Sequence, residues 1–75
     1  MSARAALSRL QRFGSSAARR MADRFTALGG RPDGRTQADR DALARVLDEE
    51  LRRPGARPGL VAELERLKAE LGGGL

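Results

Sequence analysis

The stretch that decides the fold is residues 2–28, SARAALSRLQRFGSSAARRMADRFTAL, because it reads as one long amphipathic helix. At about 100° per residue, its arginines and serines fall on the arc opposite its apolar side chains. Ser2 is a suitable N-cap, and Gly29 follows the last periodic residue, as a C-cap does. The apolar stripe consists of Ala3, Leu7, Leu10, Gly14, Ala17, Met21, Phe25 and Leu28, with Phe13 on its edge.

Gly14 interrupts the middle of this expected helix, where glycine costs roughly 1 kcal/mol relative to alanine. Two interpretations stay open. Beside Ala17 and Ala18, the glycine favours close approach of another backbone, or it marks a weak point where the helix bends.

The second half of the chain predicts a helical hairpin. Residues 31–35 form a turn, and Thr36 with Asp39 matches the capping signature of a helix start. Pro54-Gly55 stops that helix and Pro58 opens the next, so the short connection favours antiparallel packing. The apolar residues are Leu43, Val46, Leu47 and Leu51 in one helix, and Leu60, Val61, Leu64, Leu67 and Leu71 in the other. Of these, Leu43, Leu47 and Leu51 would face Leu60, Leu64 and Leu67.

We therefore expect an all-α protein of three helices, in which a long N-terminal amphipathic helix precedes a short antiparallel hairpin. Residues 1–30 are the basic docking helix, residues 31–35 the turn, and residues 36–75 the hairpin with a glycine-rich tail. Acid-before-base spacing further predicts ion pairs within the first hairpin helix, namely Asp41–Arg45, Asp48–Arg52 and Glu49–Arg53.

The composition points away from catalysis and towards contact. With no His and no Cys, the chain lacks the commonest general base, the thiol nucleophile, a disulfide and a plausible zinc site. We expect no enzymatic activity, no cofactor and no small-molecule substrate. A chain of 75 residues has a small core and usually needs a further source of stability. Without a disulfide or a metal, the source that remains is a partner.

Positive charge belongs to the first half of the chain. Residues 1–35 hold eight Arg against two Asp, a net +6, whereas residues 36–75 hold seven basic and eight acidic residues, a net −1. Such a field attracts nucleic acid, anionic lipid or an acidic protein face. However, 14 of the 15 basic residues are Arg, which together with abundant Ala and Gly is typical of a GC-rich genome.

The favoured function is a non-enzymatic helical accessory subunit or adaptor. It would dock its N-terminal helix into a protein partner, which could be a copy of itself, a phage-like particle or another multi-subunit machine. The docking residues would be Leu7, Leu10, Phe13, Met21, Phe25 and Leu28.

Three alternatives remain. The first is sequence-nonspecific nucleic-acid binding, which lacks aromatic residues interleaved with the arginines as stacking platforms. The second is association with an anionic membrane surface, and the third is a monomeric three-helix bundle without a partner. The phosphate or acidic-surface contacts would be Arg4, Arg9, Arg12, Arg19, Arg20 and Arg24.

For the location, we expect the cytoplasm or the interior of a macromolecular particle. No run approaches the roughly 18 apolar residues of a membrane span. Residues 1–22 are rich in Arg and Ser and contain no acid, which resembles a mitochondrial presequence, an assignment that we disfavour.

Overall fold

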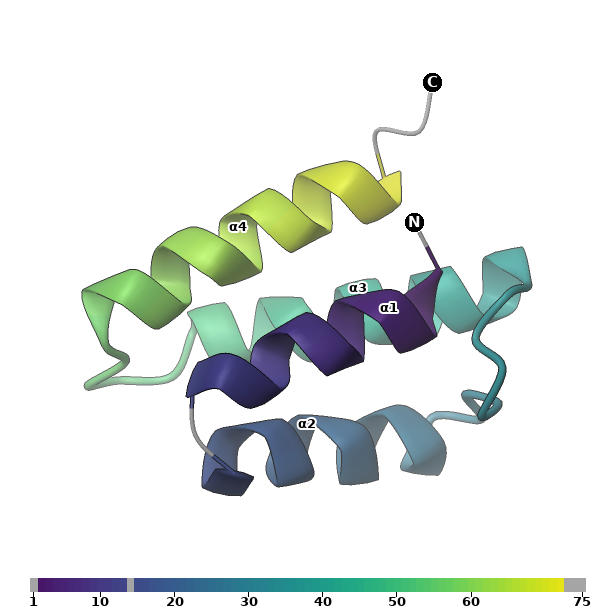
Figure 1. Ribbon diagram of the computed structural model, residues 1–75, viewed down its shortest axis with the longest axis horizontal. Coiled ribbons are helices and arrows are strands. Elements are labelled where there is room, and N and C mark those ends of the chain that lie inside the picture. The colour runs from purple at the N-terminus through teal and green to yellow at the C-terminus, as the bar shows by residue number, and fades with distance from the viewer. Residues whose placement is uncertain (1, 14, 73–75) are drawn as a thin grey trace.

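The computed structural model describes residues 2–13 and 15–72, and this part of the chain is all-helical, as predicted (Figure 1). Four α-helices pack together, with a short 3₁₀ turn after the first. They are α1 (Ala3–Leu10), η1 (Gln11–Phe13), α2 (Ser15–Ala27), α3 (Gln37–Leu51) and α4 (Pro58–Gly72).

The prediction of one long N-terminal helix is wrong. The first helix ends at Leu10, and α2 runs back alongside α1 in the opposite direction (Figure 1). A straight helix over residues 2–28 would be about 40 Å long, whereas the whole molecule measures 31 Å along its longest axis. Folding back therefore lets α3 and α4 cover apolar side chains that a straight helix would leave in water. Gly14, for which two roles were expected, lies outside the described residues.

One hydrophobic core joins both halves of the chain. The helix α3 lies at its centre, since α4, α2 and α1 all pack against it. Leu10 and Met21 from the N-terminal half are as fully buried as Leu47 from α3. The core residues are Ala3, Ala6, Leu10, Met21, Phe25, Leu43, Val46, Leu47, Leu60, Leu64, Leu67 and Leu71.

The predicted start of α3 is confirmed. The Thr36 hydroxyl accepts a hydrogen bond from the Asp39 backbone N–H at 3.1 Å, and the Asp39 carboxylate accepts one from the Thr36 N–H at 3.2 Å. Asp39 also accepts from the Arg31 backbone N–H at 2.9 Å, so the same side chain fixes the preceding turn. Pro58 is the first residue of α4, as its fixed φ predicts.

The turn before α3 is also tied to the start of α1. Ser2 caps α1 by accepting a hydrogen bond from the Ala5 N–H at 3.2 Å. The backbone N–H of Ala3, the first residue of α1, donates a hydrogen bond to the Gly34 carbonyl at 2.9 Å. Gly34 has a φ of +59°, a conformation that side chains rarely adopt. The start of α1 is thereby anchored to a segment more than 30 positions away.

Candidate functional site

The apolar residues predicted to dock into a partner do not form one exposed stripe. Leu10 and Met21 are 0% exposed and Phe25 is 4% exposed, so all three belong to the core. Leu7 and Leu28 are half-buried and pack against that core. The side chain of Phe13, the sixth predicted residue, lies outside the described part.

The expectation that the N-terminal segment has more apolar surface than the hairpin can cover therefore needs correction. It assumed a straight helix, and the break after Leu10 brings both halves of the stripe onto α3 and α4. A docking role for the whole stripe stays a prediction, and among its described members only Leu7, Ala17 and Leu28 are partly accessible in this fold.

Three of the six arginines predicted as phosphate contacts form ion pairs with carboxylates of α3 and α4. Arg20 donates hydrogen bonds from Nε and Nη2 to the two carboxylate oxygens of Glu50, at 2.8 and 2.9 Å. Arg24 makes the same bidentate contact with Glu49 at 3.2 and 3.0 Å. Arg9 reaches Glu70 at 3.3 Å.

These pairs shift the affinity of the groups for protons. Hydrogen bonds to the two glutamates raise the pKa of Arg20 and of Arg24 above the usual value. The Arg24 guanidinium, mainly through its hydrogen bonds, lowers the pKa of Glu49. The charged forms of Arg20, Arg24 and Glu49 are thus favoured, and Arg20 and Arg24 hold α2 on α3.

Two of the three ion pairs predicted within the first hairpin helix are replaced by pairs between helices, whereas Asp41 accepts a hydrogen bond from Gln37 of its own helix and not from Arg45. Glu49 binds Arg24 of α2 instead of Arg53, and Asp48 binds Lys68 of α4 instead of Arg52. Arg24 and Glu49 are 25 residues apart in sequence, so spacing rules for a single helix could not find this contact. The sequence did show that acidic residues are frequent in α3.

The remaining three arginines of the predicted set are exposed: Arg4 on α1, Arg12 on η1 and Arg19 on α2. Among residues 2–13 and 15–72, none of them makes an ion pair. Their charges are therefore free to meet a ligand. Arg4 and Arg19 both line the same surface feature, a groove between α1 and α2.

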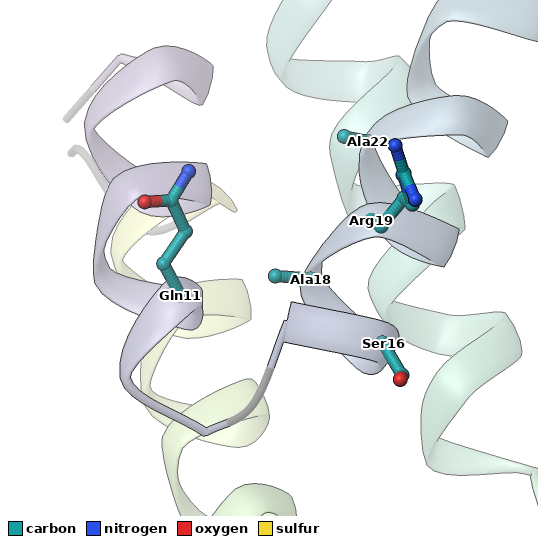
Figure 2. A pocket seen from close by; sticks show the side chains of 5 residues that line it. All are labelled: Gln11, Ser16, Ala18, Arg19 and Ala22. Atoms are coloured by element: carbon teal, nitrogen blue, oxygen red, sulfur yellow. The ribbon is translucent and has the colours of Figure 1, made fainter.

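This α1–α2 groove consists of two adjoining hollows of about 400 and 390 Å³, which share Gln11 and Ala22 in their linings. Figure 2 shows the first hollow, with the methyl groups of Ala18 and Ala22 facing the side on which Gln11 lies. Because the side chains of Ala18 and Ala22 are small, they leave space beside Gln11 at the surface. The second hollow adds Arg4, Leu7, Ser8, Phe25, Thr26, Gly30 and Pro32.

The groove combines an apolar floor with a positive rim. Leu7 and Phe25 supply apolar lining, which we call the floor; Arg19 lines the first hollow and Arg4 the second, and we call these two arginines the rim. The larger share of the surface inside both hollows is apolar, which suits a side chain or helix of a partner. The sequence did not indicate the groove, because it exists only where α2 folds back beside α1.

Comparisons with protein families, with curated proteins and with solved structures give no match. Function must therefore be argued from the chemistry of the surface. Within the described residues, no three or more Asp or Glu side chains come together as a metal site would require. In the same part of the chain, no helix has the length and apolar character needed to cross a bilayer.

Proposed function

We propose that this chain is a non-enzymatic helical adaptor that binds a protein partner through the α1–α2 groove. The partner segment is an amphipathic helix with an apolar face and acidic flanks. The observation that carries this proposal is the combination of Leu7 and Phe25 on the floor with Arg4 and Arg19 on the rim.

The geometry favours a helix as the bound segment. Ala18 and Ala22 lie one helical turn apart on α2, and their small side chains would let a helix of the partner lie beside α1. An inserted helix would cover Leu7, which the fold leaves half-buried. This reverses the roles expected from the sequence, since α1 and α2 form the groove and the partner supplies the inserted side chains.

Charge decides which helix fits. Arg4 and Arg19 have no carboxylate partner within the described chain, and a carboxylate on the inserted helix would pair with them. Such rim charges act mainly on specificity and on the rate of association. The apolar floor provides contact that resists salt.

The test is site-specific photo-crosslinking in the cells that produce the protein. A photoreactive residue replaces Thr26 at the groove or, as the control, the exposed Ala62 on α4. We expect a covalent adduct from position 26, attached to an acidic amphipathic helix of the partner. Arg4→Glu with Arg19→Glu should lower its yield at least about fivefold, whereas Arg35→Glu with Arg45→Glu should preserve it.

Two results would contradict the proposal. One is equal crosslinking from positions 26 and 62. The other is an adduct on a segment without acidic amphipathic character, whose yield both charge-reversed variants change equally.

A further inference from the structure

A second positive surface lies at one end of the bundle, away from the α1–α2 groove. The η1 turn and the loop joining α3 to α4 lie at this same end (Figure 1). Arg12 belongs to η1, and Arg52, Arg53 and Arg57 follow the end of α3 and belong to the loop; all four are exposed. We call these four arginines the basic pole.

The basic pole has little negative charge to offset it. Residues 11–22 and 51–62 contain no acidic residue. Glu50, the carboxylate that lines the hollow at this end, is buried and already bound by Nε and Nη2 of Arg20. Within the described residues, the four arginines make no ion pair. Positive charge at this end is therefore available to a ligand.

A hollow of about 400 Å³ opens at this pole between the start of α2 and the α3–α4 loop. Its donors are the hydroxyl of Ser16 and the guanidinium groups of Arg53 and Arg57. The ion pair of Arg20 with Glu50 borders it and holds α2 against the end of α3. The hollow thus brings together groups that can bind an anion, on elements that this ion pair holds in place.

We propose that the basic pole binds the phosphate backbone of a nucleic-acid duplex. Arg53 and Arg57 would hold one phosphate at the hollow with the Ser16 hydroxyl, and Arg12 and Arg52 would contact neighbouring phosphates. The proposal is independent of the α1–α2 groove. It moves nucleic-acid contact away from the predicted arginine face, where Arg9, Arg20 and Arg24 are already paired.

The character of the pole favours a duplex over other polyanions. Among the side chains that the structure describes, none that lines the hollow is aromatic, so they offer the bases of a single strand no stacking platform. An interfacial membrane contact needs a sizeable apolar face, whereas Leu60, the largest apolar residue at the hollow, is buried. Several separate arginines on a broad surface match the repeated phosphates of a duplex.

The test measures binding of the full chain to a fluorescent duplex of about 20 base pairs, by anisotropy, between about 50 and 200 mM salt. The variant Arg53→Gln with Arg57→Gln should bind at least about tenfold more weakly at the lowest salt. Its plot of log affinity against log salt should be less steep by about two units. The matched control, Arg35→Gln with Arg45→Gln, removes the same charge elsewhere and should keep the wild-type slope.

All four substituted arginines are exposed, so both variants should retain the helical circular-dichroism spectrum of the wild type. Equal loss in the pole variant and the control would overturn the proposal, because binding would then follow net charge alone. Failure of the wild type to bind the duplex at low salt would also overturn it. So would binding to phosphatidylserine vesicles under conditions where the duplex is not bound.

Discussion

Arg20 and Glu50 form a bidentate ion pair that joins the two halves of the chain, with hydrogen bonds of 2.8 and 2.9 Å. The side chain of Glu50 is only 8% exposed, whereas that of Arg20 is 37% exposed. A carboxylate so poorly hydrated needs its partner, because burying an unpaired charge is costly. The pair therefore fixes where α2 lies on α3, and with it the position of the α1–α2 groove.

Truncation of Met21 should destabilise the whole domain. The side chain is fully buried among residues of all the helices, so Met21→Ala should lower the free energy of unfolding by about 2–5 kcal/mol. Leu28→Ala, at a half-buried position, should cost less. Urea unfolding followed by circular dichroism measures both. Equal losses in the two variants would show that Met21 is no more buried than Leu28.

Asp39 predicts a dependence of stability on pH. Hydrogen bonding by the Arg31 backbone N–H, and by Thr36, lowers the pKa of Asp39 in the folded state. The carboxylate therefore stabilises the fold above its unfolded pKa of about 3.9, and this contribution is lost as the pH falls through the lower folded value.

Asp39→Asn should consequently be less stable than the wild type at neutral pH, and the difference should shrink under acid conditions. Thermal unfolding of both proteins at about pH 7 and at about pH 3 measures the change. Glu49, whose pKa is also lowered, is present in both proteins, so its contribution cancels when their stabilities are subtracted at each pH. A difference that does not vary with pH would contradict the role assigned to this carboxylate.

Gly34 should not tolerate a side chain. A Cβ atom there would lie 2.6 Å from the backbone nitrogen of Arg4, and the residue has a φ of +59°. Gly55 has a φ of +78° but nothing within 4 Å of the added atom. Gly55→Ala should therefore cost about 1 kcal/mol of backbone strain, and Gly34→Ala clearly more. The unfolding midpoints of the two variants give the comparison, and equal midpoints would argue against close approach of the turn to α1.

The parts of the fold that the sequence predicted are those with local causes. The cap at Thr36 depends on a residue three positions away, and the start of α4 depends on the fixed φ of Pro58. The all-helical class followed from apolar periodicity and from the scarcity of β-branched residues. Each of these signals is read within a few residues of where it acts.

The parts that the sequence missed depend on contacts between distant segments. The apolar stripe of residues 2–28 continues across the helix break with an unchanged period, so periodicity alone gives no sign of it. Pairing of Arg20, Arg24 and Arg9 with acids 25 to 61 residues away was likewise beyond local rules. The groove and the basic pole arise from that same folding back, which explains why neither was foreseen.

The N-terminal half packs into the domain and does not extend from it as one long helix. A double-mutant cycle on Arg20→Ala and Glu50→Ala tests it most directly, with urea unfolding as the readout. We expect a coupling free energy of about 1–2 kcal/mol. This is less than a fully buried ion pair would give, because Arg20 is partly exposed to solvent. A coupling of zero within error would contradict it, because α2 would then not be held on α3.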